Sequence, residues 1–165
     1  MPRPFGASLA TQIPARLLKC LNESAVRYEI LHEPSDPAAP RRRSAAMGLV
    51  ETAVVRAGNR RLLAVLPAEH SVNLKRFARL IGEGVRSETE DEFKWLFPDC
   101  ALGAVPPFGN LYGLTTWVDS SLADTQHIVF FAGTPYDSIK LAYSAFAEIV
   151  KPSIGAFIGS VPGKR

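Results

Sequence analysis

The stretch LVETAVVRAGNRRLLAVLP, residues 49–67, gives the first indication of the fold. It contains two apolar runs, residues 53–56 and 62–66, on either side of the turn sequence Ala57-Gly58-Asn59-Arg60. Glycine and asparagine readily adopt the backbone angles that a tight hairpin turn requires. Pro67 has no backbone N–H group and closes the second run. The sequence therefore predicts a β-hairpin.

Upstream of the hairpin, the pattern predicts a helix, a strand, a loop and a second, shorter helix. Apolar side chains recur every four positions between residues 9 and 21, which is one face of an amphipathic helix. Residues 26–31 alternate weakly like a strand, and the three prolines of residues 33–40 indicate a loop. Residues 41–47 can form a short helix, which Gly48 can end in a left-handed conformation.

Downstream of the hairpin, residues 74–81 carry a helical apolar stripe, and residues 85–86 have the pattern of a short strand. The motif Ser-Glu-Thr-Glu then predicts a capping box, in which the Ser87 hydroxyl accepts the amide hydrogen of Glu90. The helix that follows is expected to end before Pro98.

The last third of the chain predicts three strands, one helix and a tail. The strands are expected at residues 112–118, 128–132 and 139–141, and the helix near residues 145–150. Residues 153–165 are rich in glycine and proline, so we expect a loosely held tail.

The order of these elements does not alternate regularly enough for a doubly wound fold. It predicts a single α+β domain over residues 1–165, with a curved mixed sheet and helices outside it. The chain has 165 residues, of which 47% are hydrophobic and 21% charged, as in an ordinary globular protein. The formal net charge of +3 permits weak, salt-sensitive docking to a phosphate backbone without requiring it.

Membrane insertion and cofactor binding are not indicated by the sequence. No apolar run approaches the roughly 18 residues that span a bilayer, and the N-terminus lacks the apolar stretch of a secretory signal, so we expect a cytoplasmic protein. Two cysteines, Cys20 and Cys100, form neither a disulfide framework nor a metal knuckle, and we expect both to be reduced. His32, His70 and His127 are scattered. We expect no metal and no cofactor.

A stiff loop is the main candidate for chemistry. Residues 103–109 read Gly-Ala-Val-Pro-Pro-Phe-Gly. Pro107 fixes its own φ angle and lacks an N–H group, whereas Gly103 allows a ligand or another backbone to approach closely. Such a loop can direct amide hydrogens at an oxyanion or an ester carbonyl. Taken alone, it also fits a proline-rich structural turn.

The segments around this loop occur in a characteristic order. They are Leu-Pro-Ala at 66–68, Val-Asn-Leu-Lys-Arg-Phe-Ala at 72–78, Arg-Ser-Glu-Thr-Glu at 86–90, Trp-Val-Asp-Ser-Ser-Leu at 117–122, Phe-Ala-Gly-Thr-Pro at 131–135 and Ser-Ile-Lys-Leu at 138–141. In this order they resemble the YbaK/EbsC family of aminoacyl-tRNA editing proteins and the insertion domain of bacterial prolyl-tRNA synthetase. The resemblance spans about residues 17–150.

This resemblance implies a fold, an activity and partners. The implied fold is a mixed sheet curled toward a barrel, with flanking helices. The implied activity is hydrolysis of the ester that joins a wrong amino acid to its tRNA, carried out in trans. The acceptor end of an aminoacyl-tRNA would be the partner, together with weak association with an aminoacyl-tRNA synthetase.

The resemblance also implies a set of site residues. The loop amides would hold the aminoacyl carbonyl, which points to Gly103, Ala104, Val105 and Pro107. The segment Ala132-Gly133-Thr134 would line the amino-acid pocket. We expect this segment, the loop and the strand that opens at residue 51 to converge on one pocket.

At one position the chain departs from the family. The family usually begins its first hairpin strand with Lys-Thr, whereas this chain has Glu51 followed by Thr52. A carboxylate cannot donate a hydrogen bond to a phosphate or ester oxygen, and it repels the tRNA end unless it is protonated or paired.

Two interpretations follow from this departure. In the first, the chain is an active deacylase in which Glu51 orients water as a general base or binds the substrate's α-ammonium group. The missing positive charge would then come from Arg56 or from the run Arg41, Arg42 and Arg43, which otherwise reads as a solvated helix start. In the second, the chain is a catalytically silent relative that binds a small molecule, a tRNA end or a protein partner.

Overall fold

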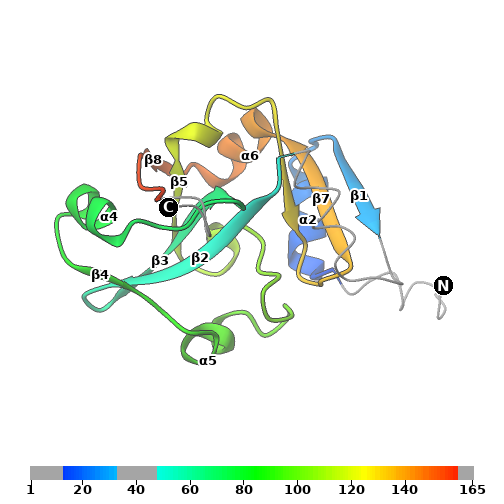
Figure 1. Cartoon of the computed structure of the whole chain (residues 1–165). Helices are drawn as coiled ribbons and strands as arrows, with labels where there is room; N and C mark the ends of the chain where they lie inside the picture. The colour runs from blue at the N-terminus through cyan, green and yellow to red at the C-terminus, as the bar shows by residue number, and fades with distance from the viewer. Residues whose placement is uncertain (1–12, 33–47, 160–165) are drawn as a thin grey trace.

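The computed structural model in Figure 1 describes residues 13–32 and 48–159. The expected proline-rich loop, the expected helix at residues 41–47 and the arginine run within it lie outside the described residues. Within the described ranges, no helix combines the length and the apolar character needed to cross a bilayer.

A three-stranded antiparallel sheet forms one half of the domain. Its strands, in spatial order, are β1 (Tyr28–His32), β7 (Asp137–Ala142) and β6 (His127–Phe131). Two helices, α2 (Ala15–Glu23) and α6 (Tyr143–Val150), contribute to the core of this half. Leu17 and Phe146 from the helices are fully buried there with Ile139 of β7. Burial of such side chains is the main stabilising contribution to this half.

A five-stranded mixed sheet forms the other half. Its spatial order is β4 (Val85–Ser87), β2 (Val50–Ala57), β3 (Arg60–Pro67), β5 (Thr115–Asp119) and β8 (Ser153–Gly155). Strand β2 pairs antiparallel with β3 and β4, whereas β5 pairs parallel with both β3 and β8. Helix α4 (Leu74–Ile81) inserts Phe77 into a second core cluster with Phe157. The short helix α5 (Glu90–Phe93) follows β4.

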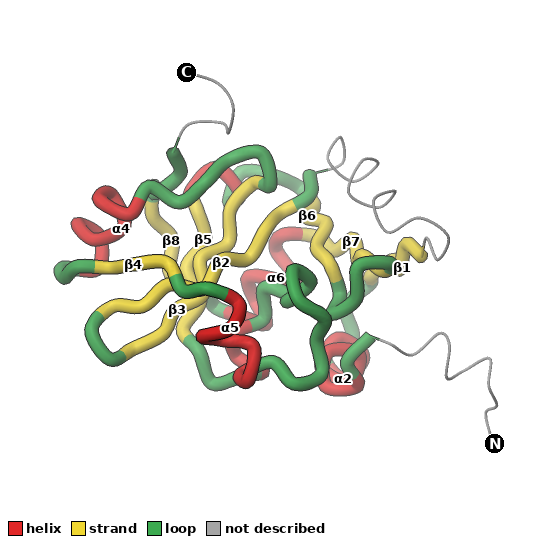
Figure 2. Tube along the Cα trace, turned by 60° about the horizontal axis from the view of Figure 1, so that its bottom comes forward, coloured by secondary structure: helices red, strands yellow, loops and turns green. Residues whose placement is uncertain are grey.

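The two sheets meet at one point. Leu49, directly before β2, forms a parallel bridge with Val129 of β6. Beyond this bridge β2 and β6 belong to different sheets, and Figure 2 shows them diverging. The fold is therefore α+β with mixed strand pairing, as predicted. The strands form two sheets that are not closed into a barrel, so the single barrel-like sheet of the prediction is not what the described strands form.

The local predictions around the hairpin are confirmed. Residues Ala57 and Arg60 pair directly, which leaves Gly58 and Asn59 as a two-residue turn. Gly58 has a φ of 63°, a left-handed angle that glycine adopts without steric cost. The helical stripe of residues 74–81 forms α4, and Gly82 ends it in the left-handed conformation.

The predicted capping box lies two residues too early. Ser87 pairs with Val55 and is the last residue of β4, so it cannot cap a helix. Thr89 is the N-cap instead: its hydroxyl accepts the Glu92 amide, and the Glu92 carboxylate accepts the Thr89 amide. The sequence Thr-Glu-Asp-Glu, which begins two residues later, satisfies the same capping pattern.

The loosely held tail is a further correction. Residues 153–155 form β8, and Phe157 is completely buried. The Asp119 carboxylate accepts hydrogen bonds from the backbone amides of Phe157, at 2.8 Å, and Ile158, at 3.2 Å. Residues 153–159 therefore follow a fixed path across the sheet rather than forming a loose end. Residues 160–165 lie outside the described part of the chain.

Candidate functional site

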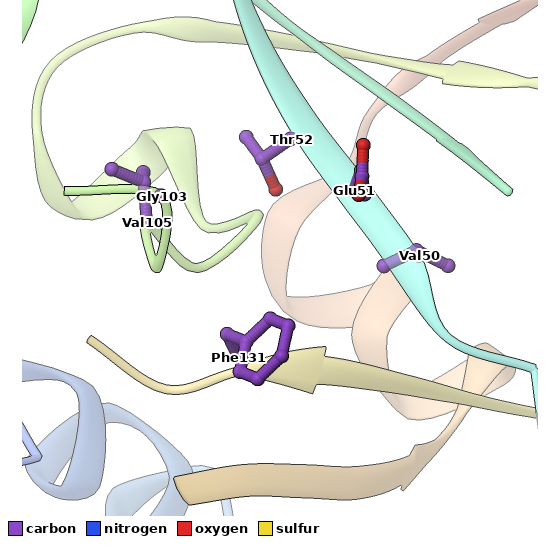
Figure 3. A pocket seen from close by; sticks show the side chains of 6 residues that line it. All are labelled: Val50, Glu51, Thr52, Gly103, Val105 and Phe131. Carbon is purple, nitrogen blue, oxygen red and sulfur yellow. The ribbon is translucent and has the colours of Figure 1, made fainter. Parts of the chain in front are cut away.

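A cavity of about 180 Å³ lies at the point where β2 and β6 separate (Figure 3). Its lining residues are Val50, Glu51 and Thr52 from β2, Gly103 and Val105 from the loop, and Phe131 from β6. Pockets for whole drug-sized ligands measure roughly 300 Å³ or more. This cavity therefore suits one group of a larger molecule.

Long-range backbone hydrogen bonds hold the loop at this cavity. Gly133 donates to the carbonyl of Ala104 at 2.8 Å and accepts from the amide of Ala101 at 2.8 Å. Gly103 has a φ of 77°, an angle that side chains with a β-carbon rarely adopt. The loop is thus fastened to the segment after β6 and turns at a glycine.

The amides of the loop differ in what they bind. Ala104 donates its amide hydrogen to the carbonyl of Ala101 at 3.2 Å, and Pro106 and Pro107 have no amide hydrogen. The amides of Gly103 and Val105 have no hydrogen-bond acceptor within residues 13–32 and 48–159. These two cavity-lining residues therefore carry the donors that can bind an oxyanion or an ester carbonyl.

Strand β2 forms the opposite wall of the cavity. Figure 3 shows the Thr52 side chain pointing toward Gly103 and Val105. The Thr52 hydroxyl has no hydrogen-bond partner in the described part of the chain. Glu51 is half-buried and lines the same cavity as Gly103. The loop and the strand therefore line one cavity, and their expected role as a functional site stays a prediction.

The segment Ala132-Gly133-Thr134 supports the loop from behind and does not line the cavity. Ala132 is fully buried, and Gly133 holds the loop through its backbone. The Thr134 hydroxyl donates to the buried Asp137 carboxylate at 2.7 Å, and Asp137 also contacts the His32 imidazole. The neighbouring Phe131 is the residue that reaches the cavity.

A polar cluster connects Asp99 and Cys100, just before the loop, to Tyr112, just after it. Asp99 binds Arg16 at 2.8 Å and accepts the Tyr112 hydroxyl at 3.1 Å, while the Cys100 thiol lies 3.4 Å from the same hydroxyl. Burial raises the pKa of Cys100 to about 11 and also raises the pKa of Tyr112. Cys100 is therefore a neutral thiol at pH 7 and not a thiolate nucleophile.

Arg56 lies away from the cavity. It is five residues beyond Glu51 along β2, or roughly 16 Å in an extended strand. Its guanidinium lies 3.5 Å from the carboxylate of Glu88, whose side chain is fully buried and also binds Arg61 at 2.6 Å. Arg56 thus belongs to a buried ion cluster, and the alternative source of charge, residues 41–43, lies outside the described residues. The described ranges also contain no cluster of three or more His, Cys, Asp or Glu residues that could hold a metal.

Comparison with known families identifies the domain. A model of the aminoacyl-tRNA editing domain matches residues 36–149, which is most of the chain. The chain belongs to this family. The resemblance inferred from the sequence motifs is thereby confirmed. A search of curated protein sequences gave no significant match.

Solved structures show the same fold. One, described as a candidate trans-editing enzyme for prolyl-tRNA synthetase, is 18% identical with a TM-score of 0.75, covering 88% of this chain and 96% of the other. A hypothetical protein, APE2540, is 15% identical with a TM-score of 0.77, covering 87% and 99%. A candidate signal transduction protein from Marinobacter aquaeolei VT8 is 15% identical with a TM-score of 0.71, covering 90% of this chain and 31% of its own.

The sequence analysis did not identify two of the residues that line this cavity. Thr52 is the one neutral polar residue within the β2 segment. Phe131 directly precedes the small-residue segment that was expected to line the pocket. The single neutral hydroxyl of this strand is the signal that could have indicated Thr52.

Proposed function

We propose that this editing-domain protein acts in trans as a deacylase that hydrolyses the ester bond of a mischarged tRNA. One observation carries the proposal: Gly103 and Val105, whose amides have no acceptor among residues 13–32 and 48–159, line the same cavity as Glu51 and Thr52. A pocket with backbone donors on one wall and a carboxylate and a hydroxyl on the other provides what ester hydrolysis requires.

In this mechanism the loop binds the ester carbonyl and strand β2 activates the attacking water. The ester carbonyl oxygen accepts from the amides of Gly103 and Val105, which stabilise the negative charge that develops there. Glu51 accepts a proton from the attacking water, which the Thr52 hydroxyl helps to orient. Water oxygen bonds to the carbonyl carbon and the ester bond to the ribose breaks. The ribose oxygen leaves with the proton that Glu51 took from the water, which restores the Glu51 carboxylate, and the products are the free amino acid and the tRNA.

The tRNA itself requires a positive surface. Arg41, Arg42 and Arg43 supply it in this proposal, because phosphate contacts from a basic run give salt-sensitive binding. Arg56 is left out, because the buried Glu88 carboxylate already occupies it. A cytoplasmic location and weak association with a synthetase are part of the same proposal.

A second candidate function is favoured by the residue at position 51. Glu51 stands where the family resemblance leads us to expect lysine, so the chain can instead be a silent relative that binds the tRNA end without cleaving it. The cavity geometry serves binding equally well, since the same amides that stabilise an oxyanion also bind a ground-state carbonyl.

A deacylation assay with a panel of mischarged tRNAs separates the two candidates. The purified full chain should release the amino acid from at least one member of the panel. In that case Glu51→Gln should slow release strongly, because the amide cannot take a proton from water. Binding without release by the wild-type chain would favour the silent relative, and gain of release in Glu51→Lys would identify a lost lysine function. Equal release from wild type, Glu51→Gln and Glu51→Lys would remove Glu51 from the mechanism.

A further inference from the structure

A second carboxylate lies beside Gly103, one of the residues that line the cavity. Glu90 is the first residue of α5, and one of its carboxylate oxygens lies 3.8 Å from the position that a β-carbon on Gly103 would occupy. Gly103 lines the cavity, and its amide is one of the two loop amides without an acceptor among residues 13–32 and 48–159. The carboxylate and the amide donor are therefore neighbours, although they come from different segments of the chain.

Glu90 differs from the other acidic residues around it. Glu88 is buried among three arginines, Glu92 pairs with Arg86 at 3.2 Å, and Asp91 pairs with Lys94 at 3.2 Å. The Glu90 side chain is exposed and has no cation or hydrogen-bond donor beside it in residues 13–32 and 48–159. Each neighbouring carboxylate is thus paired with a cation of the chain, whereas the Glu90 carboxylate can bind a cationic ligand.

The chemistry of the proposed substrate matches this arrangement. In an aminoacyl ester the α-ammonium nitrogen and the carbonyl oxygen flank the same Cα–C bond. An amide donor for the oxygen must therefore lie beside an anionic acceptor for the nitrogen. Carboxylate-to-ammonium hydrogen bonds are charge-assisted and stronger than neutral ones. A single carboxylate can therefore favour a substrate with a free ammonium group over one with a neutral nitrogen.

We propose that the Glu90 carboxylate binds the α-ammonium group of the aminoacyl substrate while the Gly103 amide binds its carbonyl. This inference rests on the proposed deacylase or tRNA-end-binding function of the same cavity. Glu90 thereby restricts the site to esters with a free α-ammonium group, and N-blocked aminoacyl esters are disfavoured. Glu51 keeps its separate task on the water.

N-acetylation tests the proposal, because it converts the ammonium group into a neutral amide. Wild type, Glu90→Gln and the adjacent control Asp91→Asn are compared on aminoacyl-tRNA and on the same tRNA with an N-acetylated amino acid. Wild type and Asp91→Asn should prefer the free ammonium form by about 10-fold or more in kcat/KM. Glu90→Gln should lose this preference by slowing only on the free form.

Binding measurements keep this test independent of turnover. An amide-linked analogue of the aminoacyl-adenosine end, with and without the N-acetyl group, is titrated against the same three proteins. If the wild type binds the free form selectively but cleaves nothing, the deacylase proposal fails and the Glu90 proposal stands. If Glu90→Gln retains the wild-type preference in both measurements, or if wild type has no preference, the Glu90 proposal is overturned.

Discussion

Two loops of this molecule present backbone amides, and they differ in what those amides bind. At the tail, the amides of Phe157 and Ile158 both donate to the carboxylate of Asp119. At the cavity, the amides of Gly103 and Val105 have no acceptor in the described part of the chain. The first arrangement binds an anion that the chain itself supplies. The second has the same kind of donors beside open space.

This difference indicates a structural role for the amides at the tail and a ligand-binding role for the amides at the cavity. Native proteins pair nearly all buried backbone donors, and the Asp119 junction follows that rule to fix the tail against β5. Donors left for a ligand belong where a cavity adjoins them, as at Gly103. We therefore expect changes at the tail junction to cost stability, and changes at the cavity loop to cost activity.

The largest effect should come from Gly103→Val. A β-branched residue disfavours a φ of 77°, so the backbone must turn and carry the amide away from the substrate carbonyl. Loss of one oxyanion donor commonly lowers the rate by 10²-fold or more, so we expect roughly a 100-fold fall in kcat for deacylation.

Gly113→Val is the matched control for this change. Gly113 has a φ of 72° and is exposed, and a β-carbon there would meet no atom within 4 Å, so the backbone strain is comparable. The control should lose similar stability and keep its activity. Wild-type deacylation by folded Gly103→Val would exclude the loop from catalysis.

Asp119→Ala should act on stability. The change removes the acceptor of the Phe157 and Ile158 amides, and buried donors without partners cost about 1–3 kcal/mol. Urea unfolding of the full chain should show a loss of roughly that size. The folded fraction should deacylate at the wild-type rate. A fall in activity per folded molecule as large as that of Gly103→Val would contradict the purely structural role of the tail junction.

We also expect the free energy of unfolding to depend on pH through the Asp119 carboxyl group. Burial opposes ionisation, but the Ser121 hydroxyl and the surrounding amides outweigh it and lower the pKa of Asp119. A carboxylate with a lowered pKa in the folded state stabilises the protein above its unfolded pKa of about 3.9, and this stabilisation is lost as the pH falls through the folded value. The acid-induced loss should be smaller in Asp119→Asn, as urea unfolding at several pH values can show.

The smallest effect is expected at the cysteines. Burial raises the pKa of both Cys20 and Cys100, in the latter to about 11, so neither is a thiolate at neutral pH. Alkylation of Cys100 by iodoacetamide should be slow at pH 7 and faster toward pH 11. Cys100→Ala should leave the deacylation rate unchanged, and a large fall in that rate in a stable variant would point to thiol chemistry.

The sequence predicted the elements whose signals are local. The hairpin turn depends on Gly58 and Asn59 alone, and α4 depends on its own apolar stripe and on Gly82. The loop at residues 103–107 was also identified from its glycine and prolines. These features need no distant partner, so a pattern within a few residues suffices.

The features that the sequence analysis missed depend on distant partners. The tail is fixed by Asp119, 38 residues before Phe157 in the chain, and composition alone could not indicate that contact. The hydrogen bonds that hold the loop also determine which of its amides can bind a ligand. The Ala104 amide is used by the Ala101 carbonyl, and Gly133 binds the backbone of both residues. The split between β2 and β6, which creates the cavity, likewise follows from a pairing between Leu49 and Val129.

The most direct test of the central claim follows individual amides by nuclear magnetic resonance. A non-hydrolysable, amide-linked analogue of the aminoacyl-adenosine end is titrated into ¹⁵N-labelled protein. The amide signals of Gly103 and Val105 should shift most, with signals from Glu51 and Thr52, while those of Phe157 and Ile158 stay in place because Asp119 already binds them. Binding of the analogue without any shift at Gly103 and Val105 would contradict the account.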